Sequence, residues 1–210
     1  MKKHFFCFLL LGALVPFVSG CATIDKAKRT DLLEKRVAEL QDEIQRLEQE
    51  KNSELERAKK DLTETLAKEL GAAQAKLEMT ERGLVITFLA EIFFDSGKAD
   101  MRPEGKPILE KVAKVLNKDV SGSNVAVEGH TDADPIKRSG WKSNWELSSA
   151  RALAVLHYFV DEGRIKPARL SANAYGEFRP VASNDAREGK QKNRRVEIVI
   201  LPSNVKKIKD

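Results

Sequence analysis

Residues 124–132 read NVAVEGHTD, and residues 144–152 read NWELSSARA. The first stretch alternates apolar and polar side chains, which is typical of a strand with one buried face. The second stretch begins a pattern that continues to about Glu162 and stops at Gly163, which predicts a helix. A strand that leads through a polar loop into a helix is therefore expected at the centre of the fold.

Outward from this unit, the same patterns predict further strands and helices in alternation. The β-rich apolar run LVITFL is expected to be a buried strand, and Pro103 suits the first turn of a helix. The predicted strands are 84–89, 124–128, 170–175 and 195–201, and the predicted helices are 103–117 and 144–162.

This order of elements, strand, helix, strand, helix, strand, strand, defines the expected fold class. Each strand–helix–strand unit is expected to form a right-handed parallel crossover. Residues 83–202 should therefore form one α+β domain (an α/β sandwich of βαβαββ order) with a mixed sheet and both helices on one face. About 120 residues suffice for a single core.

Residues 31–82 are predicted to form a long helix, because apolar residues recur at steps of three and four from Leu33 to Leu77. The apolar stripe is narrow and the other faces are charged, as in a coiled coil. Asp31 begins a possible capping box, and Gly83 is expected to follow the last helical residue. The helix is either a seam for a homo-oligomer or a solvated spacer of about 75 Å per fifty residues.

The first twenty residues have the features of a targeting signal. Lys2 and Lys3 precede an apolar run from residue 5 to residue 17, a length that suits a signal peptide and is short for a membrane-spanning helix. The run ends in Val-Ser-Gly followed by Cys21, which resembles the lipobox of bacterial lipoproteins. Residues 1–20 are therefore interpreted as a signal peptide.

The lipobox resemblance implies that a diacylglyceryl group is attached to the sulfur of Cys21 and that cleavage makes this residue the new N-terminus. Acyl chains of this kind, palmitate among them, hold a protein firmly because each buried methylene contributes roughly 0.8 kcal/mol. Ala22 follows the cysteine, and resemblance to enterobacterial sorting favours the outer membrane. Residues 21–30 are expected to be a short lipidated tether on the periplasmic side.

Charge and cysteine content exclude other classes of protein. The formal net charge is +5, and removal of Lys2 and Lys3 leaves about +3, which is ordinary for a soluble domain. No nucleic-acid partner is therefore predicted, and the basic residues of 203–210 are interpreted as a solvated tail. The two cysteines are Cys7 and Cys21, so the mature domain has no thiol pair for a disulfide.

Four motifs carry a resemblance to a known family. FDSG at 94–97, GHTD at 129–132, the NxxLSxxRA pattern at 144–152 and NRRVEI at 193–198 occur in this order. They are similar to the signatures of the OmpA/MotB-like peptidoglycan-binding domain. The resemblance extends from about Gly83 to Leu201, and it implies that the partner is peptidoglycan and that the ligand is the free end of meso-diaminopimelate in the wall peptide.

The chemistry of the matched positions suits that ligand, which carries an ammonium and a carboxylate on one carbon. Arg151 can bind a carboxylate through two parallel hydrogen bonds near the positive N-terminus of its helix. Asp132 can accept from an ammonium. The resemblance makes these two residues the primary contacts, with secondary candidates at Asn144, Thr131, Asp95 and Arg194. The alternative is an internal salt bridge between Asp132 and Arg151.

Several residues near the predicted site allow more than one interpretation. His130, Asp132 and Asp134 could suggest a metal, but three alternating residues on one extended segment rarely converge, so no metal is predicted. No cofactor and no catalytic residue are predicted either. Arg195 and Glu197 are interpreted as a solvated strand face. The two tryptophans near the site, Trp141 and Trp145, either pack against the loop or line the groove.

The leading hypothesis is a non-enzymatic lipoprotein that tethers the outer membrane to the wall. One rival is a helical oligomerisation or scaffold protein of the cell envelope. A second is a peptidoglycan hydrolase, which would need a nucleophile–base or carboxylate pair that is not evident. The loop at 133–143 is closer to MotB-like members, but the apolar segment carries no acidic residue, so a proton-conducting stator is not expected.

Overall fold

The computed structural model describes residues 19–137 and 139–202. Most of the predicted signal peptide, the side chain of Cys21 and the predicted tail at 203–210 lie outside the described residues. The chain divides into two compact units, with the boundary between Arg46 and Leu47. Within the described ranges, no helix combines the length and the apolar character needed to cross a membrane.

Helix α1 occupies Ser19–Thr65, so both ends of the predicted helix at 31–82 are wrong. The residues expected to form a tether, 21–30, are helical. After α1 come a short helix α2, Ala67–Gly71, and a strand β1, Ala75–Thr80. The strand was missed because Leu77 fits a helical step from Ala73 and also the alternation of a strand.

Gly83 begins strand β2, Gly83–Leu89, and does not end a helix. β1 and β2 form an antiparallel hairpin with Thr80 opposite Gly83. Gly83 has a φ of +123°, and a Cβ on it would lie 2.1 Å from the carbonyl oxygen of Ile200. Only glycine suits this position, because the backbone of β5 approaches it so closely.

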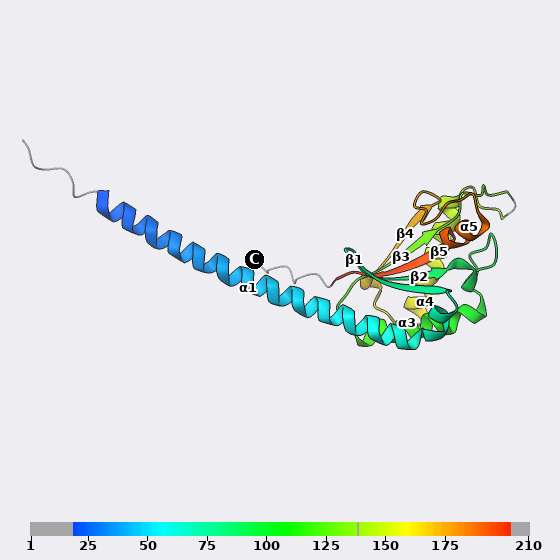
Figure 1. Cartoon of the computed structure of the whole chain (residues 1–210), viewed down its shortest axis with the longest axis horizontal. Coiled ribbons are helices and arrows are strands. Elements are labelled where there is room, and N and C mark those ends of the chain that lie inside the picture. Colours follow the sequence, from blue (N-terminus) through cyan, green and yellow to red (C-terminus); the bar gives the residue numbers. More distant parts are fainter. Residues whose placement is uncertain (1–18, 138, 203–210) are drawn as a thin grey trace, which may run out of the picture. The chain divides into compact units, whose positions relative to one another are not determined.

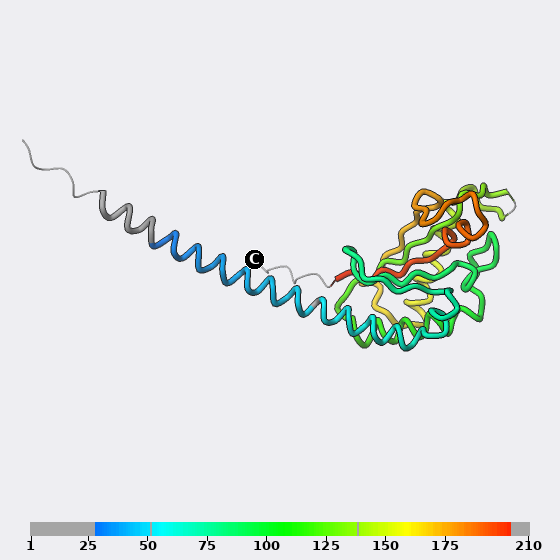
Figure 2. Tube along the Cα trace, in the orientation of Figure 1, coloured from blue at the N-terminus to red at the C-terminus, as the bar shows by residue number. Residues whose placement is uncertain are grey.

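The sheet contains β1, β2, β3 (Val125–His130), β4 (Leu170–Gly176) and β5 (Arg195–Ile200) in the order β1-β2-β5-β3-β4. β5 pairs antiparallel with both β2 and β3, whereas β3 pairs parallel with β4. In Figure 2 the last strand, in red, lies between strands from earlier in the chain. The predicted mixed sheet is confirmed, with β1 as an additional edge strand.

Two longer helices follow β2, α3 at Lys106–Lys118 and α4 at Asn144–Asp161, close to their predicted ranges. Figure 1 shows both on one face of the sheet. Short 3-10 turns occur at Ala90–Ile92, Pro103–Gly105 and Pro167–Arg169, and a short helix α5, Arg187–Asn193, was not predicted.

One hydrophobic core lies between this face of the sheet and the helices. It includes Leu109 from α3, Phe159 from α4 and Ile86 from β2. The last turns of α1 belong to the same core through four buried residues, Leu55, Ala58, Leu62 and Leu66. This part of α1 is therefore a component of the folded domain, because its apolar stripe has a partner within the chain.

Candidate functional site

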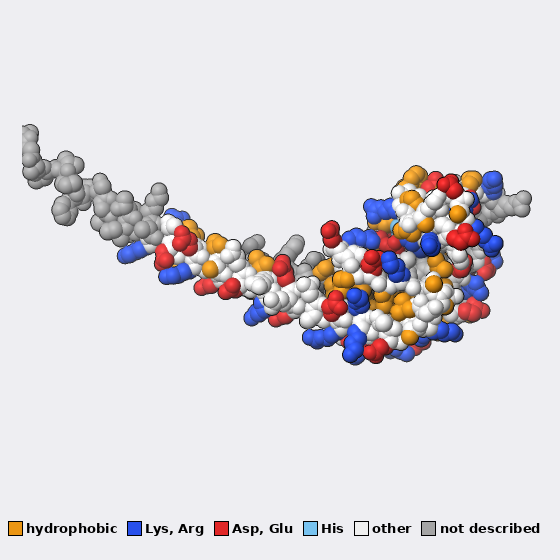
Figure 3. Space-filling view, in the orientation of Figure 1, with side chains coloured by type: hydrophobic (Ala, Val, Ile, Leu, Met, Phe, Trp, Pro, Cys, Tyr) orange, Lys and Arg blue, Asp and Glu red, His pale blue; other side chains and the backbone are white. Residues whose placement is uncertain are grey.

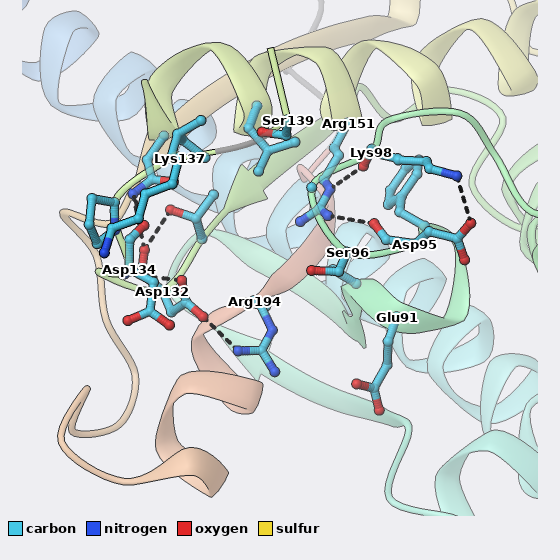
Figure 4. A pocket seen from close by; sticks show the side chains of 18 residues that line it. Glu91, Asp95, Ser96, Lys98, Asp132, Asp134, Lys137, Ser139, Arg151 and Arg194 are labelled. Carbon is cyan, nitrogen blue, oxygen red and sulfur yellow. Dashed lines mark hydrogen bonds and ion pairs between the residues drawn. The ribbon is translucent and has the colours of Figure 1, made fainter. Parts of the chain in front are cut away.

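A pocket of about 640 Å³ lies where β3 ends, α4 begins, β5 begins and the turn after β2 folds back. All six residues predicted from the sequence line it: Asp95, Thr131, Asp132, Asn144, Arg151 and Arg194. These residues are separated by up to about 100 positions in the chain. The sheet order β2-β5-β3 and the packing of α4 bring them to one end of the sheet. Figure 4 shows their arrangement.

Close packing of α4 against β3 fixes this end of the sheet. A Cβ on Gly129 would lie 2.0 Å from the backbone oxygen of Ser148, so the helix can approach only a glycine. The buried hydroxyl of Ser148 accepts a 3.0 Å hydrogen bond from the backbone N–H of Gly176 in β4. The matched serine and glycine therefore serve to position the helix that carries Arg151.

Asp132 and Arg194 form an ion pair. Nη1 of Arg194 donates to Oδ2 of Asp132 over 2.6 Å, while Oδ1 accepts from the backbone N–H of Asp134 over 3.2 Å. Asp132 is buried, whereas the side chain of Arg194 is partly exposed. Arg194, a secondary candidate from the sequence, is thus the direct partner of the primary candidate Asp132.

Arg151 is 4% exposed and is held by the turn after β2. Its Nε donates to the carbonyl oxygen of Lys98 over 2.9 Å, its Nη2 donates to that of Asp95 over 3.2 Å, and the guanidinium lies 5.4 Å from the ring centroid of Phe94. Burial lowers the pKa of Arg151 to about 10, with a further lowering by Arg194 and an opposing effect of Asp132. The group therefore stays charged at neutral pH.

The alternative of an internal salt bridge between Asp132 and Arg151 is wrong. Among the residues that the structure describes, every ion pair within 4.0 Å of Asp132 involves Arg194, and none involves Arg151. Arg151 has only neutral carbonyl acceptors, although its charge is buried. In Figure 4 the guanidinium groups of Arg151 and Arg194 border the same space. The pocket consequently offers a cation without an anionic partner.

Asn144 and Thr131 shape the loop between β3 and α4. Nδ2 of Asn144 donates to the backbone oxygens of Asp132, over 3.4 Å, and Asp134, over 3.1 Å, and also to the carboxylate of Glu177. The hydroxyl of Thr131 donates to the backbone oxygen of Asp132 over 2.9 Å. Both side chains are buried and engaged within the protein, so their main contribution is to hold Asp132 in place.

Asp95 contributes to the site mainly through its backbone. Its carbonyl oxygen accepts from Arg151, whereas its exposed carboxylate lies 3.4 Å from Nζ of Lys98 and 3.9 Å from Nε of Arg102. Sequence reasoning missed three other charged residues of the pocket lining, Glu91, Lys98 and Lys137, and considered Asp134 only as a metal ligand. They lie in turns and loops, where no periodic pattern indicates which way a side chain points.

Asn193, the residue that begins the NRRVEI motif, has a structural role that the sequence did not reveal. Oδ1 of the fully buried Asn193 accepts from the backbone N–H groups of Val181 and Ala182, over 2.8 and 3.0 Å. Its Nδ2 donates to Oδ1 of Asn184 over 2.9 Å, and that oxygen also accepts from the backbone of Ala133. Asn193 therefore ties the loop after β4 to the loop that carries Asp132.

The interpretation of Arg195 and Glu197 as a solvated strand face is wrong. Both are buried, and Nε of Arg195 donates to Oε1 of Glu197 over 2.7 Å. Arg82 donates to Glu197 over 3.0 Å and to Glu128 over 2.7 Å. This charge cluster covers the sheet face opposite the helices, because Arg82 in the β1–β2 turn reaches across it.

His130 belongs to that cluster and not to the pocket. It is 2% exposed, stacks on Tyr175 at 5.1 Å and, together with Glu128 and Glu197, forms a group whose ligand atoms lie within 4.8 Å of one another. The two carboxylates are already bound by arginines, which supply the positive charge that a metal would bring. Burial and Arg195 lower the pKa of His130 to about 3, so it is neutral at physiological pH.

The two tryptophans near the site have different surroundings. Nε1 of the partly buried Trp141 donates to the carbonyl oxygen of Gly97 over 2.9 Å, so Trp141 packs against the turn that holds Arg151. Trp145 is 48% exposed and lies outside the pocket lining. Its ring stacks on that of Phe178, with centroids 5.2 Å apart. The packing interpretation fits Trp141, and neither interpretation accounts for Trp145.

Comparison with known proteins identifies the family. Residues 93–194 match the OmpA family. Motility protein B of Bacillus subtilis (strain 168) is 40% identical over 149 residues, which cover 71% of this chain and 57% of that protein. Probable lipoprotein YiaD of Escherichia coli (strain K12) is 34% identical over 119 residues, which cover 57% of this chain and 52% of that protein.

A solved structure described as the cell wall anchor of the T6SS from Pseudomonas aeruginosa is also similar. It is 34% identical, has a TM-score of 0.60, and the match covers 67% of this chain and 96% of that one. The chain therefore belongs to the OmpA family. It spans about half the length of the curated relatives quoted above. Membership confirms the predicted family and the α+β fold.

Proposed function

We propose that this protein binds the peptidoglycan wall by recognising the free end of diaminopimelate in the pocket. The observation that carries the proposal is the buried guanidinium of Arg151, which has neutral carbonyls as its partners and lines the same pocket as the carboxylate of Asp132. A buried charge is costly unless it is compensated. A ligand carboxylate at Arg151 supplies that compensation.

The rest of the ligand's end group suits the other side of the pocket. An ammonium on the same carbon as the carboxylate can donate to Asp132, which Arg194 and the backbone of Asp134 already orient. Each charge-assisted hydrogen bond contributes roughly 1.5–3 kcal/mol, so a single contact is expected to be weak, in the micromolar to millimolar range. The wall repeats the ligand many times, and this raises the effective concentration.

The comparisons support a role at the wall. The similar structure from Pseudomonas aeruginosa is described as a cell wall anchor. The hydrolase alternative has no support at the two central residues of the pocket, since Asp132 is bound by Arg194 and Arg151 is bound by backbone carbonyls, an arrangement that suits recognition. The proposed role is therefore a tether without catalytic activity.

A change of ligand tests the proposal without any risk to folding. Two soluble wall peptides that differ only in diaminopimelate or lysine at the same position are titrated against the full chain in mild detergent by calorimetry. Lysine lacks the second carboxylate, so it should bind about 10- to 100-fold more weakly. Equal affinities would refute recognition of diaminopimelate, and absence of binding to both peptides would refute wall binding.

We also propose that Cys21 is acylated and attaches the chain to the outer membrane, facing the periplasm. The support is the lipobox-like sequence before Cys21, with Ala22 after it, and similarity to a protein named as a probable lipoprotein. Radiolabelled palmitate should be incorporated into the wild type and not into Cys21→Ser. Recovery of unmodified chain from the outer membrane would contradict the lipid attachment.

The exposed first part of α1 supports a further proposal, a homo-oligomer. Leu33, Val37 and Ile44 are exposed, and Figure 3 shows apolar side chains among charged ones on this helix. Steps of four and three continue through Leu40 and Leu47 and place Val and Ile at one heptad position and Leu at the other. This composition favours parallel two-stranded coiled coils. The last turns of α1 are occupied by the core, so the seam is confined to residues before 51.

Sedimentation of the full chain in detergent tests the seam. The paired change Val37→Glu and Ile44→Glu should convert a dimer to a monomer, because it places like charges on both helices. Glu39→Lys, an exposed change away from the seam, should leave the dimer intact. A wild type that sediments as a monomer at all concentrations would exclude self-association and favour a solvated spacer.

A further inference from the structure

A stacked pair of exposed aromatic rings lies beside the pocket without a role in it. Trp145 is 48% exposed and Phe178 is 62% exposed, and their rings stack with an interplanar angle of 23°. Val181, also exposed, follows in the same loop. Apolar side chains usually gather inside a protein, so an exposed aromatic pair at one place indicates a contact surface.

The pair is connected to the pocket through two residues. Asn144 lines the pocket, and Trp145 is the next residue of α4. The amide of Asn144 donates to the carboxylate of Glu177, and Phe178 is the next residue after it. The end of β4 lies against this turn of α4, since a Cβ on Gly176 would be 3.4 Å from the backbone nitrogen of Trp145. The aromatic pair and the pocket are therefore fixed relative to each other.

We propose that Trp145 and Phe178 bind a sugar ring of the wall's glycan strand while the pocket holds the diaminopimelate of the attached peptide. This inference rests on the proposed function. A pyranose has one flat face of C–H groups and a rim of hydroxyls, and the negative face of an aromatic ring attracts such C–H groups. A broad, solvent-exposed aromatic surface with polar residues around it suits this ligand.

The distances within the ligand agree with this placement. Diaminopimelate is the third residue of the peptide that leaves the glycan strand, and three extended residues span about 10 Å. The Cα atoms of Asn144 and Trp145 are about 3.8 Å apart, as in any trans peptide, and the indole adds its own length. Asn144 of the pocket lining directly precedes Trp145 in α4, so a ligand of about this length that starts in the pocket can extend along the surface toward the aromatic pair.

Polar groups beside the rings can receive the sugar hydroxyls. The guanidinium of Arg179 lies over the ring of Tyr175, with 3.8 Å between its Cζ and the ring centroid, and Arg179 directly follows Phe178. The carboxylate of Glu177 precedes the same phenylalanine. A purely apolar partner, such as an acyl chain or a protein core, would offer no hydrogen bond to either charged group, beyond the contacts that Glu177 makes with Asn144 and Arg179 makes with Tyr175. A sugar offers hydroxyls to both.

Two soluble wall fragments test the proposal, one with the stem peptide alone and one with the same peptide on its disaccharide. The full chain in detergent should bind the disaccharide fragment about tenfold more tightly. In Trp145→Ala and Phe178→Ala this preference should disappear while the affinity for the peptide alone is unchanged, which also shows that the pocket is folded. Leu153→Ala, an exposed change further along α4, should retain the preference.

The contrary outcomes separate this inference from the proposed function. A wild type that binds both fragments equally overturns the sugar site and leaves the pocket assignment intact. A wild type that binds neither fragment overturns both. Equal weakening of both fragments by Trp145→Ala shows that Trp145 only shapes the pocket, and a changed sedimentation coefficient with an unchanged preference shows that the rings bind a second copy of the chain. Either result overturns the sugar site.

Discussion

Arg194 donates a hydrogen bond of 2.6 Å to Oδ2 of Asp132, so the carboxylate expected to receive the ligand already has a cationic partner. Arg151, by contrast, donates to carbonyl oxygens within the part of the chain that the structure describes. The two guanidinium groups therefore differ in role, since Arg194 orients the acid and Arg151 presents a charge that makes no direct contact with a carboxylate in the described structure. A ligand ammonium has to share Asp132 with Arg194, while a ligand carboxylate can approach both arginines.

The pairing predicts that Asp132 and Arg194 act as a unit in binding. Asp132→Asn and Arg194→Met should each weaken binding of a diaminopimelate peptide about tenfold, because each removes a charge-assisted hydrogen bond. The double variant should be little worse than either single one, which corresponds to a coupling energy of at most about 1.4 kcal/mol. Calorimetric titration of the wild type, the two single variants and the double variant measures this coupling energy. Strictly additive losses of binding free energy would show that the two residues contribute independently.

Close packing at Gly129 predicts a large effect on stability. In Gly129→Ala the new Cβ would meet the backbone oxygen of Ser148 at 2.0 Å, so α4 has to move away from β3. We expect a loss of about 3 kcal/mol or more in the free energy of unfolding, measured with denaturant. Gly122→Ala is the matched control, since its Cβ meets nothing within 4 Å. Similar stabilities of both variants would contradict this packing.

Burial of the last turns of α1 predicts that leucine-to-alanine changes destabilise the protein near the end of this helix and not near its beginning. Leu62→Ala should cost about 2–5 kcal/mol, because it opens a cavity in the core. Leu32→Ala changes an exposed leucine of the same helix and should stay within about 0.5 kcal/mol of the wild type. Denaturant unfolding compares the two, and a harmless Leu62→Ala would mean that α1 is not part of the domain.

Neutral His130 predicts a dependence of stability on pH. Its pKa in the folded protein is about 3, below the ordinary value of 6.5, because burial and Arg195 disfavour the charged form. Between these values the unfolded chain binds more protons than the native one, so stability falls as the pH drops below about 6.5, by roughly 1.4 kcal/mol per pH unit. Glu197, whose pKa is lowered from 4.5, adds its own loss only at more acidic pH.

Replacement of the imidazole should remove this slope. His130→Phe keeps a flat ring against Tyr175, and neither ring nitrogen of His130 has a hydrogen-bond partner to lose. Stability of this variant should be nearly constant from pH 6.5 to 5, as followed by thermal unfolding. His157→Gln, an exposed change in α4, should keep the wild-type slope. An unchanged slope in His130→Phe would assign the effect to another group.

Much of the domain could be predicted because its core strands and helices follow simple periods. α4 begins at Asn144 as expected, and β5 with its apolar alternation was also predicted. β1 was missed because its residues satisfy a helical step and a strand step equally well. Only the pairing of Leu77 with Ile86 in β2, a tertiary contact, decides between them.

The six site residues could be predicted from motifs, but their pairing could not. Sequence reasoning placed Asp132 opposite Arg151, whereas the register of β5 brings Arg194 next to Asp132. The buried charge cluster around Glu197 was missed for a similar reason, since Arg82 lies in the β1–β2 turn but was predicted as the last residue of a helix. Ion pairs between distant segments depend on sheet order, which no local pattern encodes.

The burial of the last turns of α1 has a consequence for where the folded domain begins. Leu55, Ala58, Leu62 and Leu66 lie in the same core as the helices and strands that follow them, although the match to the family begins only at residue 93. A fragment that starts at residue 83 would expose this part of the core to water, because the apolar side chains that cover it would be missing. The independently stable unit therefore has to include the last turns of α1.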